Sequence, residues 1–330
     1  MKRLIFIFAL MIVLISINCS SINQPDEWDK ENLVAFSAIY NTDSGYVGRI
    51  VIADYNNPSN YEIVTPPELK AVEPVFSYTK EKILFGLDGI MAHGYQFAVY
   101  DINTSEMEKL YASNIADSTP VFGEKPVWDF DDRGFYFTQY HSYSIAKGIY
   151  YYDLTTKEVT GLYTPQDASV YVVGLKSQDT LIVFSNKYFL ASQDSNCLFY
   201  MSKSGEYISQ IKNPHLVLIN INGITKKGPL YTNWNYQNKQ FAYSSINYDQ
   251  MGYAISTTDV EGTYYKRHTN SYYDTRPVWG PDNSIIFFNR QTDSNQPAQL
   301  YFVNTVTGDV RQFIDPNKIN GADQIIDAAY

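Results

Sequence analysis

Short apolar stretches separated by turns recur along the chain. Residues 277–283 read Pro-Val-Trp-Gly-Pro-Asp-Asn, and apolar stretches follow at 285–288 and 300–303. The same order returns from residue 126, where Pro-Val-Trp precedes two more apolar stretches, and from residue 74. Short apolar stretches bounded by Gly, Asn, Asp or Ser predict strands and turns, and nothing after Leu33 has the longer period of a helix. The pattern predicts an all-β protein built from a repeated unit.

The spacing of the repeat predicts how the units are assembled. Trp234 and Trp279 lie 45 residues apart, which suits a four-stranded propeller blade of about 40–50 residues. The first unit lacks an opening strand, whereas segment 322–330 follows a complete last unit. We therefore predict a six-bladed β-propeller of four-stranded blades over residues 33–330. Pairing of its N- and C-terminal segments would close the ring and remove the free sheet edges.

The repeated phrase resembles that of a known family. Pro-x-Trp-x-Pro-Asp-x, followed by an apolar strand and an Ile/Leu-Tyr-x-x-Asp/Asn strand, is similar to the Pro-Asp repeat of TolB-type six-bladed β-propellers. Residues 277–283 carry it in full, and the units from residues 74 and 126 carry it without the Pro-Asp pair. The resemblance implies a propeller and contact with other envelope proteins. It implies no single activity, because propellers serve as scaffolds, receptors and enzymes.

The N-terminal segment has the pattern of an export signal. Two basic residues precede the apolar stretch 4–17, which is too short for a comfortable membrane span, and Cys19 follows closely. We expect a lipoprotein-type signal peptide over 1–18, lipid attachment at Cys19 and a polar tether over 19–32. The alternative is a plain secretory signal with a chance cysteine. The lipoprotein reading predicts a bacterial outer-membrane protein that faces the periplasm or the cell surface.

Charge and cysteine content narrow the classes of partner. The net charge of −10 argues against nucleic acid, which needs a basic surface, and against an electrostatic hold on anionic lipid. Membrane contact is therefore expected through the N-terminal lipid only. With Cys19 acylated, Cys197 is the one remaining cysteine, so no internal disulfide is expected.

The sequence offers no constellation for catalysis. It contains no Gly-x-Ser-x-Gly motif, and its four histidines are scattered without metal-ligand spacing. The acidic segment 129–132 falls at a predicted turn, where we interpret it as structural. We predict no catalytic residue, no metal and no cofactor, and leave an enzymatic activity open.

Two groups of residues are candidates for binding. Glu73, Lys125 and Arg276 each precede a Pro of the repeat, so they are expected near one mouth of the central channel. Tyrosines in or beside predicted turns are candidates for an aromatic rim, because tyrosine suits recognition of proteins and glycans. These rim candidates are Tyr140, Tyr143, Tyr272 and Tyr273. The alternative is a composition rich in tyrosine, with 30 in the chain.

Together these patterns predict a noncatalytic cell-envelope lipoprotein whose propeller provides a protein-binding or scaffolding surface. Other envelope proteins are its expected partners. The alternative is a propeller that binds a glycan or small molecule, or an enzyme that acts on carbohydrate at the channel mouth.

Overall fold

The computed structural model describes most of the chain beyond its N-terminal segment. It separates into two compact units, Met1–Lys30 and Glu31–Tyr330, and the features below belong to the second. The described residues are 28–43, 45–87, 94–115, 119–140, 147–165, 170–185, 198–216, 219–221, 224–226, 230–247, 252–270, 273–293 and 296–330. The expected signal peptide, Cys19 and most of the tether lie outside them, as does Cys197.

Four-stranded antiparallel groups follow one another along the chain. In the first group the order is β28 (Gln324–Ala329), β1 (Leu33–Thr42), β2 (Gly45–Asp54) and β3 (Tyr61–Ile63). The second is β4 (Ala71–Phe76), β5 (Lys82–Leu87), β6 (Tyr95–Asp101) and β7 (Glu106–Lys109). The third is β10 (Phe122–Trp128), β11 (Gly134–Tyr140), β12 (Lys147–Asp153) and β13 (Val159–Tyr163).

The same order continues through the rest of the chain. The next group is β14 (Val170–Ser177), β15 (Thr180–Ser185), β16 (Leu198–Ser202) and β17 (Tyr207–Gln210). Then come β20 (Leu230–Asn235), β21 (Gln240–Asn247), β22 (Gly252–Asp259) and β23 (Tyr265–Arg267). The last is β24 (Tyr273–Trp279), β25 (Ile285–Gln291), β26 (Gln299–Asn304) and β27 (Val310–Gln312). Antiparallel pairing of β6 with β10 and parallel pairing of β22 with β24 join two pairs of these groups into eight-stranded sheets.

The remaining elements are short. Two hairpins pair β8 (Tyr111–Ala112) with β9 (Thr119–Pro120) and β18 (Ile219–Ile221) with β19 (Ile224–Lys226). The 3-10 helices are η1 (Lys30–Asn32), η2 (Pro214–Leu216), η3 (Pro281–Asn283) and η4 (Pro316–Lys318). Among the described residues no helix is long and apolar enough to cross a membrane. The all-β prediction is confirmed.

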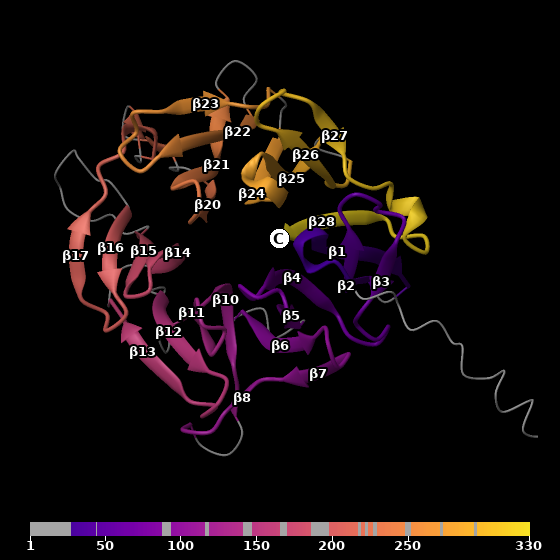
Figure 1. Cartoon of the computed structure of the whole chain (residues 1–330), viewed down its shortest axis with the longest axis horizontal. Helices are drawn as coiled ribbons and strands as arrows, with labels where there is room; N and C mark the ends of the chain where they lie inside the picture. The colour runs from indigo at the N-terminus through magenta and orange to yellow at the C-terminus, as the bar shows by residue number, and fades with distance from the viewer. Residues whose placement is uncertain are drawn as a thin grey trace, which may run out of the picture. The chain divides into compact units, whose positions relative to one another are not determined.

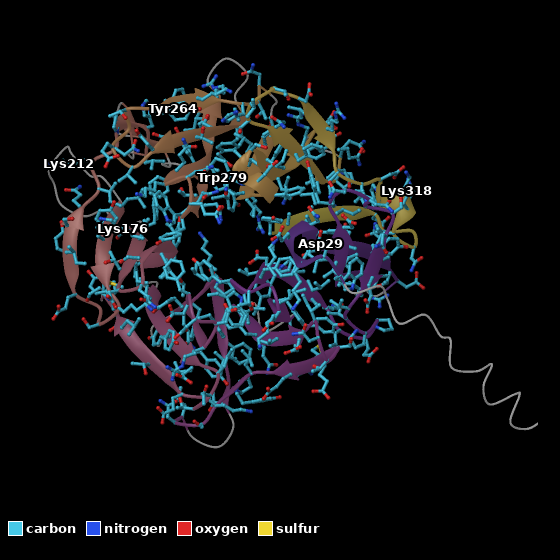
Figure 2. The ribbon with its side chains drawn as sticks, in the orientation of Figure 1. Asp29, Lys176, Lys212, Tyr264, Trp279 and Lys318 are labelled. Carbon is cyan, nitrogen blue, oxygen red and sulfur yellow. The ribbon has the colours of Figure 1, made fainter. Side chains whose placement is uncertain are left out.

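The groups of the Glu31–Tyr330 unit surround a common centre (Figure 1), with β4, β10, β14, β20, β24 and β28 innermost. Trp279 lies on the inner side of its group and Tyr264 on the outer side (Figure 2).

The second strand of each group explains the continuous apolar runs in the sequence. In β5 and β25 five successive residues are buried, because neighbouring groups cover both faces of the sheet. Phe184 and Phe241, from β15 and β21, belong to one such core between two groups. Burial on both faces removes the alternation of apolar and polar residues that a half-exposed strand would show.

Tryptophans of the repeat join one group to the next. Trp128 Nε1 donates a hydrogen bond of 3.0 Å to the carbonyl oxygen of Val75 in the preceding group. Trp234 Nε1 donates one of the same length to the carbonyl of Leu175. Each indole thus adds a polar contact to the apolar area that it buries between sheets.

The terminal segments lie in one sheet. β28 pairs antiparallel with β1, with Ala38 opposite Ile325, and Ile325 is fully buried. β1 and β2 extend into polar residues, since Thr42 pairs with Gly45 at their far end. The apolar residues indicate only the packed part of each strand, whereas the backbone ladder continues into polar residues.

Candidate functional site

A cavity of about 940 Å³ lies among the innermost strands. Three basic and three acidic residues line it, together with tyrosines and small apolar residues. The charged residues are Lys70, Glu73, Glu124, Lys125, Arg276 and Asp327. Such a volume is within the range of small-molecule sites, in which a few polar groups converge within a mostly apolar wall.

A repeated backbone irregularity directs side chains to this cavity. Five inner strands, β4, β10, β20, β24 and β28, each have a register shift relative to the adjacent strand. The shift contains one residue of left-handed backbone conformation in each strand. These are Glu73 (φ 54°), Lys125 (51°), Tyr231 (54°), Arg276 (54°) and Asp327 (56°), and all five line the cavity. We call them the bulge residues. A β-bulge changes the direction in which a strand presents a side chain.

The structure brings the three predicted channel residues, Glu73, Lys125 and Arg276, to the same cavity. Sequence reasoning missed Tyr231 and Asp327, because no proline follows them. A different signal finds all five, since each bulge residue has an aromatic residue three positions later. These aromatics are Phe76, Trp128, Trp234, Trp279 and Tyr330.

One half of the cavity is held by an ion-pair network. Arg276 Nη1 lies 2.8 Å from Glu73 Oε1 and 2.9 Å from Asp327 Oδ1, so one guanidinium joins β24, β4 and β28. Asn289 Nδ2 also donates to Asp327 Oδ1 at 2.9 Å, and the Asp327 backbone N–H donates back to Asn289 Oδ1 at 3.0 Å. We call these four residues the Arg276 network.

Burial and charge act in opposite directions within the Arg276 network. Burial raises the pKa of Glu73, and the positive charge of Arg276 offsets only part of that rise. For Arg276, burial alone would lower the pKa, but the carboxylates of Asp327 and Glu73 raise it above its usual value. The guanidinium is therefore charged, and it compensates two carboxylates at once.

Aromatic and basic side chains lie beside the Arg276 network. Lys125 Nζ lies 3.5 Å from the ring centroid of Tyr171, within cation–π range. The Tyr231 ring centroid lies 5.2 Å from Arg276 Cζ, and 38% of Tyr231 remains exposed. Lys125, Tyr231 and Arg276 also line an adjoining cavity of about 180 Å³, and Tyr171 and Thr232 line only that one. We call Lys125, Tyr171 and Tyr231 the Lys125 wall.

Aromatic residues meet in the turns that follow the inner strands. The Phe130 ring lies 4.5 Å from that of Tyr78 and 4.9 Å from that of Tyr236, measured between centroids. These residues follow β4, β10 and β20, and none of them lines either cavity. We call Tyr78, Phe130 and Tyr236 the aromatic triad. They come after the cavity-lining residues of these three strands in the sequence and are not part of the cavity.

The acidic segment 129–132 has structural contacts, in line with its interpretation from the sequence. Asp132 accepts hydrogen bonds from the backbone N–H groups of Tyr78 and Thr79, at 2.7 and 3.0 Å. Asp129 forms an ion pair of 2.6 Å with Lys203. Both carboxylates therefore connect neighbouring turns.

The predicted rim tyrosines do not form one described feature. Tyr140 ends β11, where its backbone pairs with Lys147. Tyr273 is the first residue of β24, where it pairs with Gln291 and is partly buried. Tyr143 and Tyr272 lie outside the described residues.

No group of three His, Cys, Asp or Glu residues in the described part of the chain is arranged to hold a metal ion. His93 and His141 lie outside that part. His268 is partly buried, with Nε2 2.9 Å from Thr257 Oγ1. Burial, and secondly the charge of Lys266, lower the pKa of His268 to about 4.

His268 should make stability depend on pH. The unfolded chain binds a proton at His268 near pH 6.5, whereas the folded chain binds it only near pH 4, so stability falls as the pH drops through this interval. Allowing for partial exposure, we expect about 1–2 kcal/mol of this loss to disappear in His268→Gln. Urea denaturation between pH 4 and 7.5 measures it. His215→Gln, which also removes a partly exposed imidazole, is the control, and equal slopes for wild type and His268→Gln would contradict the assignment.

Comparison with known proteins concerns the fold. No family model and no curated protein matches the sequence. Among solved structures, the chain is similar to TolB from Acinetobacter baumannii, with 13% identity, a TM-score of 0.65 and coverage of 92% of this chain and 67% of that one. It is also similar to an oligogalacturonate lyase in complex with manganese, with 13% identity, a TM-score of 0.53 and coverage of 86% and 73%. A chain of a nidogen/laminin complex has 7% identity, a TM-score of 0.58 and coverage of 90% and 97%. The chain therefore has an all-β, β-propeller-like fold of the kind seen in TolB.

Proposed function

We propose that this protein is a noncatalytic binding propeller of the bacterial cell envelope, and that its central cavity is the binding site. The observation that carries the proposal is the set of five bulge residues from five inner strands, all of which line one cavity. A left-handed conformation costs a residue with a side chain about 1–2 kcal/mol. Repeated backbone strain around one concave site is typical of functional positions.

We further propose six blades closed by pairing of β28 with β1, and an anchor at Cys19. The recurring four-stranded groups and the position of β28 as the inner strand of the first group support the ring. The apolar stretch before Cys19 supports export. The protein would thus hold its cavity near the membrane surface.

The Arg276 network supports a role in binding and not in catalysis. Glu73 and Asp327 both bind Nη1 of Arg276, so both carboxylates are already engaged by the protein. A general base must take up a proton from the substrate, which would break its ion pair with Arg276. The lyase in the comparison shares only its fold with this chain.

A retention experiment tests the cavity as the binding site. The full-length protein, purified in detergent, is incubated with a small-molecule extract of the host envelope, washed and denatured, and the released compounds are identified by mass spectrometry. We expect a compound retained by the wild type and by Tyr207→Ala, an exposed tyrosine on β17, but lost from Lys125→Gly/Tyr231→Gly. Equal retention by all variants, or no retained compound, would overturn the proposal.

Protein docking is the second candidate function, favoured by the aromatic triad. Tyr78 and Tyr236 are 45% and 47% exposed, and exposed aromatic clusters are common anchors of protein interfaces. Crosslinking in the native host, followed by affinity capture, tests this function. A stoichiometric envelope protein whose capture is lost in Tyr236→Ser would support docking at the triad, and capture unchanged by that variant would exclude it.

A further inference from the structure

We infer that the cavity takes an uncharged oligosaccharide and that the Lys125 wall makes the contacts, whereas the Arg276 network holds the strands together. This inference rests on the proposed binding function and names its ligand class. Three features support the inference: the ion pairs that already occupy Arg276, the balance of positive and negative charge in the lining, and the exposed faces of tyrosine rings.

Arg276 is already engaged by the protein. Its Nη1 binds two carboxylates from two other strands, and the Asp327 side chain is only 9% exposed. A ligand that bound the guanidinium would have to displace one of these carboxylates and leave it buried without a cation, which is unfavourable. Recognition is therefore expected at Lys125 and Tyr231, which line both this cavity and the adjoining one.

The balance of charge in the lining disfavours charged and purely apolar ligands. Three carboxylates oppose a polyanion, and three cationic side chains oppose a polycation. An apolar ligand would take these groups out of water without giving them hydrogen bonds. An uncharged ligand with many hydroxyl groups donates to carboxylates and accepts from the ammonium group of Lys125, because each hydroxyl does both.

Tyrosine faces complete the match with a sugar ring. Tyr46 is 64% exposed and Tyr231 is 38% exposed, and both line the cavity together with Tyr95. An aromatic ring offers an apolar face with a polar hydroxyl at its edge, and a pyranose offers C–H faces edged by hydroxyls. In the described part of the chain Thr232 Oγ1, beside the Lys125 wall, is a buried hydroxyl oxygen with no hydrogen-bond partner. A ligand hydroxyl that reached this oxygen would supply its missing hydrogen bond.

The left-handed backbone of the bulge residues allows a test in which a side chain is removed without destabilising the fold. Glycine adopts a left-handed conformation without the steric cost that a side chain pays, so Tyr231→Gly and Lys125→Gly remove the side chain and relax the backbone. We expect both variants to melt at or above the wild-type temperature. A loss of binding in them then cannot be ascribed to unfolding.

Binding is measured by isothermal titration calorimetry with the full-length protein in detergent. The probes are neutral cello-, malto-, xylo- and chito-oligosaccharides of two to six units, oligogalacturonate as the acidic probe, and tri- to hexapeptides. We expect at least one neutral oligosaccharide to bind, with affinity reduced at least tenfold in Tyr231→Gly, reduced severalfold in Lys125→Gly and unchanged in Tyr207→Ala. Because the ligand is uncharged, its affinity should change less than threefold between 50 mM and 500 mM NaCl.

The outcomes separate this inference from the proposed function. Binding of oligogalacturonate or peptides alone, lost in Tyr231→Gly, would overturn the ligand class and leave the cavity as a binding site. Neutral oligosaccharide binding that survives in both glycine variants would overturn the Lys125 wall. Failure of all probes, together with retention of a non-carbohydrate compound in the extract experiment, would overturn the ligand class only. Failure of both experiments would overturn the binding function as well.

Discussion

Removal of the last ten residues, 321–330, is expected to abolish the cooperative unfolding transition of the Glu31–Tyr330 unit. The deletion takes away β28, whose Ile325 is fully buried, and exposes the edge of β1 to solvent. It also removes Tyr330, whose ring centroid lies 3.1 Å from Lys80 Nζ. The deletion leaves an inner strand unpaired and opens the apolar core beside it. Once the packing around that strand is lost, we expect the cost in free energy to exceed the whole stability of a typical domain, about 5–15 kcal/mol.

Thermal melting followed by circular dichroism measures this effect, with resistance to protease as a second readout. The matched control replaces residues 321–330 by ten Gly and Ser residues, which keeps the chain length but not the strand. A synthetic peptide of residues 321–330 should restore the transition to the truncated chain when it is added in excess. A truncated chain that melts at the wild-type temperature would show that β28 is dispensable.

Arg276→Ala is the point substitution with the largest expected cost in the cavity. It leaves the Glu73 and Asp327 carboxylates partly buried with no cation between them, since their side chains are 26% and 9% exposed. Breaking a buried pair costs about 3–5 kcal/mol, and partial exposure reduces our expectation to about 2–4 kcal/mol. Urea denaturation of the variant and the wild type at pH 7 measures the difference.

The pH dependence of that deficit distinguishes electrostatics from lost packing. Without Arg276, burial holds the pKa of the Glu73 carboxyl above its unfolded value, so the folded variant binds more protons than the unfolded chain. Its deficit relative to wild type should therefore shrink as the pH falls from 7 to 4. Arg311→Ala removes an exposed pair of 3.7 Å and should cost less than about 0.5 kcal/mol. A deficit that is the same at both pH values would identify packing as the cause.

The repeat in the sequence predicted which residues of different units lie at the same level of the fold, but it did not predict which residues they contact. Glu73 and Arg276 occupy equivalent places before a proline, and this was enough to bring them to one cavity. It could not show that they bind one another across 203 positions, because a repeat gives no information on which units adjoin. Asp327 was missed for a related reason, since the terminal strand carries only a degenerate form of the motif.

Apolar composition predicted the packed parts of strands and missed what lies at their ends. The extension of β1 to Thr42 depends on backbone pairing, which has little signal in side-chain polarity. Phe130 was hidden within an acidic segment, although its ring contacts two other turns.

The bulge residues line the binding cavity, whereas other residues pack the apolar cores of the fold. Their side chains line the cavity and belong to none of the described apolar cores, whereas the strands that carry them keep their register through other residues. Glu73 and Asp327 form ion pairs with Arg276, whereas Lys125 and Tyr231 make cation–π contacts, with Tyr171 and Arg276 respectively. Single codon changes at positions 125 and 231 could thus alter specificity during evolution without a search for a new stable fold. The same two positions are the natural starting point for a mutant library aimed at new ligands.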